Sequence, residues 1–153
     1  MAHLPITVMI SQEKKQSELS VLNDFKNHYE DFPKGRIRKT ESPDFIVEVT
    51  PRRTVGIELT RLLPAGPASA SHRYVPARLS REILMLTIEK KEEKLPIYFE
   101  KKLDYIWLII TINKLDNASS LNLPDRFSEW DVTSLFNKIF LFDTGKSRVH
   151  ILK

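Results

Sequence analysis

The sequence predicts an α/β or α+β fold, with a mixed central sheet flanked by helices. Its elements are expected in the order helix, strand meander, helix, strand and terminal hairpin. Segments 44–50 and 54–60 alternate apolar and polar residues, as half-buried strands do. Segment 104–112 is apolar on both faces, so we expect it at the centre of the sheet.

The first helix is expected from Ser11 to Glu30. Ser11 is suited to the N-cap, and Leu22, Phe25 and Tyr29 follow one another at helical spacing. These three apolar residues predict the face that packs on the sheet.

The strand meander is expected to begin with a short strand over 37–40. Segments 44–50 and 54–60 follow it, joined by Pro51-Arg52-Arg53. If these three residues form the hairpin loop, Thr50 pairs with Thr54.

The second half of the chain supplies the remaining elements. A breaker-rich segment over 63–74 is expected to be a mobile loop that could overhang a site on the preceding strand. A second helix is expected from about Pro76 to Lys94. A short helical turn over 131–136 and a hairpin over 138–152 complete the chain.

Composition indicates one domain, residues 1–153, with an ordinary globular balance of 41% hydrophobic and 29% charged residues. No apolar run approaches the roughly 20 residues that span a bilayer. Cysteine is absent and no secretory leader is recognisable, so we expect a cytoplasmic (intracellular) protein without membrane attachment. The net charge of +4 permits a nucleic-acid partner without requiring one.

Two acidic residues are expected to meet on one face of the meander. With the three-residue loop, Asp44 lies opposite Thr60, and Glu58 is a diagonal neighbour roughly 7–8 Å away. A two-residue loop without a bulge would instead place Asp44 with Leu59, on the other face. Because adjacent carboxylates repel each other, such a pair indicates a divalent cation such as Mg²⁺.

Basic residues are concentrated in the sequence around the two acids. We expect four of them to bind nucleic-acid phosphates: Arg52, Arg53, Arg61 and Arg73. A solvated basic face would explain the same charges.

Together, Pro43-Asp44 and Glu58-Leu59-Thr60 resemble the motif of the PD-(D/E)xK nuclease superfamily. The resemblance covers residues 11–112 and implies the restriction-endonuclease-like fold with its αβββαβ core. It also implies hydrolysis of phosphodiester bonds in nucleic acid, with DNA as the expected substrate.

The resemblance implies a role for several individual residues. Asp44 and Glu58 would bind Mg²⁺ (or Mn²⁺), with the backbone carbonyl of Leu59 as a further ligand. A metal-activated water would then attack the phosphodiester. Glu18, on the sheet-facing side of the first helix, is the candidate for a further acid.

Thr60 departs from the motif, which places a lysine at this position. Some members of the superfamily carry that lysine on the following helix, and Lys91 fits this arrangement better than Lys90 or Lys94. The same lysines could simply form a solvated helix end. The alternative is therefore a catalytically inactive nuclease-fold module that binds nucleic acid or a protein partner.

Two further questions stay open at the level of sequence. The chain could form a homodimer or rely on a separate targeting partner, since no specificity domain is recognisable. It could also be an unrelated α/β protein, in which Asp44 caps a turn and Glu58 pairs with Arg52 or Arg61.

Overall fold

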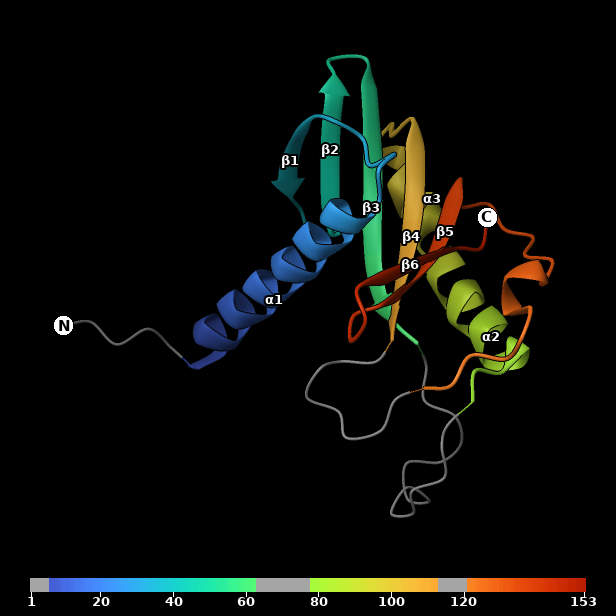
Figure 1. The fold of residues 1–153 in the computed structure, drawn as a ribbon. Helices are drawn as coiled ribbons and strands as arrows, with labels where there is room; N and C mark the ends of the chain where they lie inside the picture. The colour runs from blue at the N-terminus through green and yellow to red at the C-terminus, as the bar shows by residue number, and fades with distance from the viewer. Residues whose placement is uncertain (1–5, 63–77, 113–120) are drawn as a thin grey trace.

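The computed structural model describes residues 6–62, 78–112 and 121–153 (Figure 1). Its elements, in chain order, are α1 (Ile6–His28), β1 (Arg36–Lys39), β2 (Phe45–Thr50), β3 (Arg53–Arg61), α2 (Arg81–Glu92), α3 (Leu95–Glu100), β4 (Tyr105–Ile112), the 3-10 helix η2 (Phe127–Glu129), β5 (Lys138–Asp143) and β6 (Arg148–Ile151). Among these helices, none is long and apolar enough to cross a membrane.

The six strands form one mixed sheet in the order β1-β2-β3-β4-β5-β6. The first three strands are an antiparallel meander, β3, β4 and β5 run parallel, and β6 returns antiparallel to β5. The predicted α+β class, the central position of 104–112 and the terminal hairpin are confirmed.

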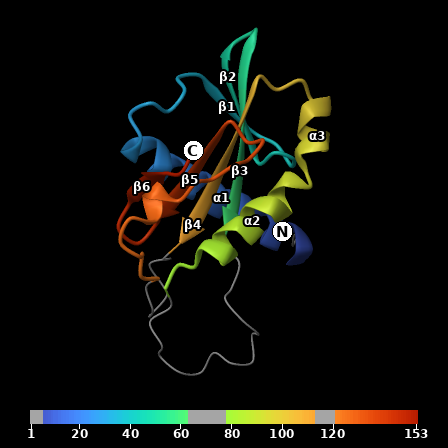
Figure 2. The ribbon, with the colours of Figure 1, turned by 90° about the vertical axis from the view of Figure 1, so that its right-hand side faces the viewer.

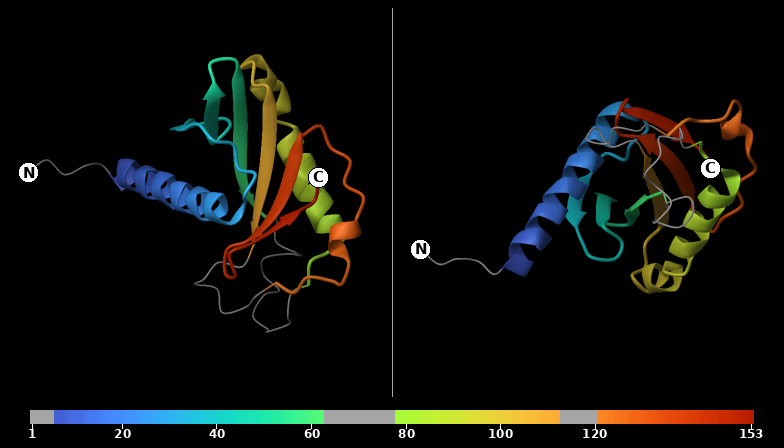
Figure 3. Two further views of the ribbon diagram at one scale, coloured as in Figure 1. Left: turned by 45° about the horizontal axis from the view of Figure 1, so that its top comes forward. Right: turned by 90° about the horizontal axis from the view of Figure 1, so that it is seen from below.

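Helices lie on both faces of the sheet, as the view from below shows (Figure 3). On one face, Leu22 and Phe25 of α1 and Tyr29, which follows its last residue, pack against alternate residues of β2 to β5. On the other face, α2 and α3 cover the intervening residues (Figure 2). Because each strand alternates its side chains between faces, Glu58 and every second residue before and after it on β3 face α2 and α3.

Both helix predictions need corrected boundaries. α1 begins at Ile6, so Ser11 lies inside the helix and is not its N-cap. α2 begins at Arg81, where the side chain of Ser80 accepts a hydrogen bond from the Ile83 N–H. Helix-capping chemistry at Ser80 thus fixes a start that the proline pattern placed at Pro76, a residue outside the described part.

Other predicted elements also differ. The second helix does not run continuously to Lys94: α2 ends at Glu92, and Pro96 then opens α3. The helical turn predicted over 131–136 is wrong, because that segment is not helical and η2 lies before it. The expected loop over 63–74 lies outside the described residues.

Candidate metal and catalytic site

The turn that leads into β2 places Asp44 against β3. Gly56 makes this possible, because a Cβ atom there would lie 3.0 Å from the Pro43 ring and 2.7 Å from the Leu103 side chain. With that space free, Pro43 packs on β3 and the Oδ2 atom of Asp44 accepts a hydrogen bond from the Leu59 N–H at 2.8 Å. Asp44 is therefore anchored to the neighbouring strand rather than capping its own turn.

The register of the hairpin differs from the prediction by one residue at the turn and by two residues at Asp44. Thr50 pairs with Arg53, not with Thr54, so the turn has two residues, Pro51 and Arg52. A bulge between Glu48 and Thr50 restores the parity, and Phe45 pairs with Ile57. Extending this register by one residue places Asp44 across from Glu58. The predicted position opposite Thr60 is wrong, but the two acids still meet.

Glu58 is a buried acid, with 3% of its surface exposed. Its Oε1 atom lies 3.1 Å from the Nζ atom of Lys91 and 4.0 Å from that of Lys94, both approaching from the α2 side. The Oε2 atom is also buried and has no hydrogen-bond partner among the residues that the structure describes. A buried carboxylate thus has one neutralised oxygen and one oxygen open to a further ligand.

The environment of Asp44 disfavours its charge. Burial, followed by the negative charge of Glu58, raises the pKa of Asp44 from 3.8 to about 6. The Leu59 N–H and Lys39 act in the opposite direction, while Glu18 adds to the increase. The positive charge near Asp44 therefore does not fully compensate for its burial and for the repulsion from Glu58.

Glu18 reaches the site through a lysine. The Nζ atom of Lys39 lies 2.6 Å from Glu18 Oε2 and 3.7 Å from Asp44 Oδ1. The same ammonium donates to the backbone carbonyls of Thr40 and Asp44 and lies 4.7 Å from the centre of the Phe45 ring. Glu18 thus contacts Asp44 indirectly, with Lys39 between them.

The carbonyl of Leu59 points towards the same edge of β3 as its N–H, because both groups of a strand residue face one neighbour. The β2 ladder ends at Phe45, opposite Ile57, so this edge is covered by Asp44 rather than by strand backbone. Thr60 follows on β3 with a hydroxyl 3.4 Å from the Arg61 carbonyl. This position provides no positive charge.

These groups fit a hard divalent cation in part. In the described ranges, no group of three or more His, Cys, Asp or Glu residues is arranged to hold a metal. Two carboxylates do meet, however, and one buried carboxylate oxygen has no partner. With the Leu59 carbonyl, they offer the oxygen ligands that Mg²⁺ and Mn²⁺ accept, leaving further positions for water.

The predicted phosphate-binding arginines are not gathered around the acids. Arg52 and Arg53 lie at the β2–β3 turn, and Arg53 precedes Glu58 by five strand residues, roughly 17 Å. Arg61, exposed at the end of β3, is nearer to Glu58. Arg73 lies outside the described residues.

Sequence reasoning missed two residues of this cluster. Lys39 was visible only as one of several basic residues, since its partners Glu18 and Asp44 come from other elements. Tyr98 is fully buried on α3, and burial, followed by the charge of Glu58, raises the pKa of its phenol. No sequence spacing connects Tyr98 with Glu58, because their proximity depends on the packing of α3 on the sheet.

Comparison with protein families, characterised proteins and solved structures finds no match in any of the three. The geometry does address the alternative in which Glu58 pairs with an arginine. Within the described residues, its ion pairs are with Lys91 and Lys94 instead of Arg52 or Arg61.

Proposed function

We propose that this protein is a metal-dependent nuclease that hydrolyses phosphodiester bonds in nucleic acid, with DNA as the expected substrate. One observation carries the proposal: a buried glutamate, Glu58, faces Asp44 on one side and contacts Lys91 on the other. Burying two acids and a lysine together carries a desolvation cost, so a cluster of this kind is a candidate functional site. The cluster offers the charges that phosphoryl chemistry requires.

The roles follow from position. Asp44, Glu58 and the Leu59 carbonyl would hold Mg²⁺ or Mn²⁺, which supplies an activated water and neutralises charge on the phosphate. Lys91 brings the positive charge that the motif expects at Thr60, and its contact with Glu58 keeps it at the site. Arg61, at the end of the same strand, is suited to a neighbouring phosphate.

The order of elements supports the same proposal. A helix, three antiparallel strands, helices and a strand parallel to the third follow one another along the chain. This is the order of the αβββαβ core that the resemblance implies, with both acids in the meander. We therefore propose the restriction-endonuclease-like fold as the finer description of this α+β sheet.

A second candidate is a catalytically inactive module on the same fold that binds nucleic acid or a protein. Thr60 favours it, because a hydroxyl carries no charge. The Lys91 ammonium is also paired with Glu58, which leaves it less available to a phosphate. In either case, self-association or a separate targeting partner would supply specificity.

Metal binding is tested by thermal unfolding with and without Mg²⁺ or Mn²⁺, for the wild type, Asp44→Ala and Glu58→Gln. A cation that binds the folded state at about 100 times its Kd stabilises it by about 2.7 kcal/mol. Glu48→Gln is the matched control, since Glu48 lies four residues from Asp44 on β2 and its half-exposed side chain pairs with Arg38. A shift in the wild type and control alone supports the site. Equal shifts in all four proteins refute it.

Activity is tested by incubating supercoiled plasmid, single-stranded DNA and RNA with the protein and Mn²⁺. Cleavage that is abolished by EDTA and by Lys91→Met identifies a nuclease. Metal binding combined with intact substrates identifies the inactive module. A Lys91→Met variant as active as the wild type would show that another group supplies the missing charge.

A further inference from the structure

Tyr98 is a polar residue that the proposed chemistry leaves unexplained. Its side chain is fully buried, although tyrosine usually keeps its hydroxyl at a partner or in water. In the described part of the chain, no hydrogen bond of ordinary geometry satisfies its hydroxyl, although the Glu58 carboxylate and Ser42 lie close to it. A buried hydroxyl without a partner is destabilising, so its retention calls for an explanation.

The second orphaned oxygen of the site is Oε2 of Glu58. Tyr98 packs in the same buried cluster as Leu108, which is the β4 partner of Glu58, so the Tyr98 phenol lies near the Glu58 carboxylate. Lys91 contacts Oε1 and leaves Oε2 free of protein partners in the described residues. A donor without an acceptor therefore lies beside an acceptor without a donor.

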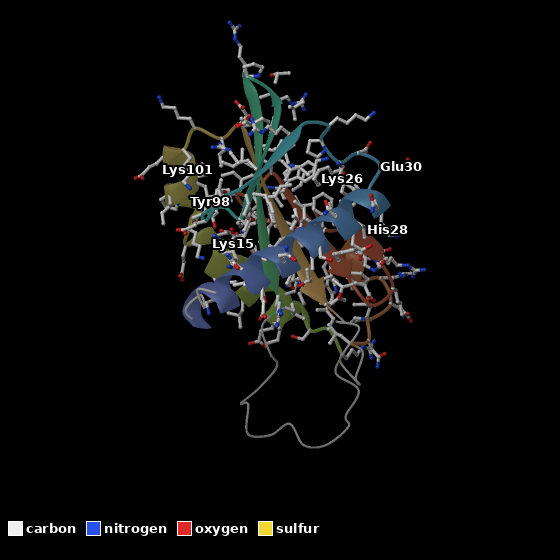
Figure 4. The ribbon with its side chains drawn as sticks, turned by 90° about the vertical axis from the view of Figure 1, so that its left-hand side faces the viewer. Lys15, Lys26, His28, Glu30, Tyr98 and Lys101 are labelled. Carbon is white, nitrogen blue, oxygen red and sulfur yellow. The ribbon has the colours of Figure 1, made fainter. Side chains whose placement is uncertain are left out.

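The helix α3 holds Tyr98 in this place. Leu95 and Tyr98 are buried in the core between α3 and the sheet, and Figure 4 shows Tyr98 between the helix and the strands. Lys101, just beyond α3, donates a hydrogen bond to the Ser42 carbonyl. The helix thus contacts the turn that carries Asp44 as well as the neighbourhood of Glu58.

We propose that Tyr98 is a positioning residue of the metal site, whose hydroxyl donates a hydrogen bond to the Glu58 carboxylate and orients Oε2 towards the bound cation. This inference rests on the proposed metal site. Groups that orient metal ligands typically change metal affinity by 10–100-fold when removed. Lys91 fixes one oxygen of the carboxylate and Tyr98 fixes the direction of the other.

The test is Tyr98→Phe, which removes one oxygen atom and retains the ring. Mn²⁺ affinity is measured by titration followed by electron paramagnetic resonance, and unfolding of the metal-free protein is measured in urea. We expect at least a tenfold weaker Kd for Mn²⁺, with unchanged or slightly greater metal-free stability. The matched control is Tyr105→Phe, because Tyr105 is 41% exposed at the start of β4.

The outcomes separate this inference from the proposed function. If the wild type binds Mn²⁺ and Tyr98→Phe binds it equally well, the positioning role is refuted and the metal site stands. If Tyr98→Phe loses affinity only in proportion to a loss of metal-free stability, Tyr98 has a packing role and the inference fails. If neither protein binds Mn²⁺, the proposed function and the inference both fail.

Discussion

Replacing Lys91 by methionine tests whether the buried ion pair holds the site together. Methionine keeps the length and apolar stem of the lysine but removes its charge, leaving Glu58 with 4% of its side chain exposed. Removing one partner of a buried pair costs about 3–5 kcal/mol. Lys94, at 4.0 Å from the same oxygen, can offset part of that cost. We therefore expect a loss of about 3 kcal/mol.

The loss should be visible in thermal unfolding. In a domain of this size, 1 kcal/mol corresponds to about 2–4 °C, so the midpoint should fall by about 6–12 °C. The loss should shrink in Mn²⁺, which replaces the missing positive charge if the cation binds beside Glu58.

The control for this experiment lies one residue away. Lys90 is exposed on α2, so Lys90→Met removes the same charge from the same helix without touching Glu58. The double variant Glu58→Gln with Lys91→Met should recover part of the lost stability, giving a coupling energy within the roughly 0.5–3 kcal/mol range of contacting pairs. If Lys91→Met is no more destabilising than Lys90→Met, the pair contributes nothing and the reasoning is refuted.

Two further predictions follow from the same geometry. Because the pKa of Asp44 is raised from 3.8 to about 6, the folded state binds this proton more tightly, and metal-free stability should fall by up to about 3 kcal/mol as pH rises from about 4 to 6. Urea titrations should show that this dependence of stability on pH vanishes in Asp44→Asn. The opposite dependence contributed by His150, whose pKa is lowered, is common to both proteins. A pH dependence that is the same in both proteins would contradict the assignment to Asp44. Gly56→Ala should cost about 1–3 kcal/mol and weaken Mn²⁺ binding, because the methyl group would meet the Leu103 side chain at 2.7 Å and the Pro43 ring at 3.0 Å, and both must shift. Mn²⁺ affinity equal to that of the wild type in Gly56→Ala would exclude this role for Gly56.

The elements that sequence predicts well are those with strong local patterns. Alternation identified β2 and β3, and a run of apolar residues on both faces identified β4 as central. Helical spacing identified the sheet-facing side of α1 and with it the inward position of Glu18. In each case, the buried face can be predicted from the spacing of apolar residues within one continuous segment.

What sequence could not provide depends on contacts between distant elements. Lys39 joins Glu18 to Asp44 only because β1 ends beside both the helix and the turn. Tyr98 reaches Glu58 only because α2 ends at Glu92 and α3 follows at once. Local propensity contains no information about which side chains such packing brings together.

The bulge in β2 is the feature on which the meeting of the two acids depends. With a two-residue turn and regular pairing, Val49 would lie opposite Thr54 and Asp44 opposite Leu59, on the face that packs against α1. The bulge gives Glu48 that partner instead, shifts every preceding pair by one position and brings Asp44 across from Glu58. A one-residue irregularity at the far end of the hairpin therefore decides which face the acid occupies.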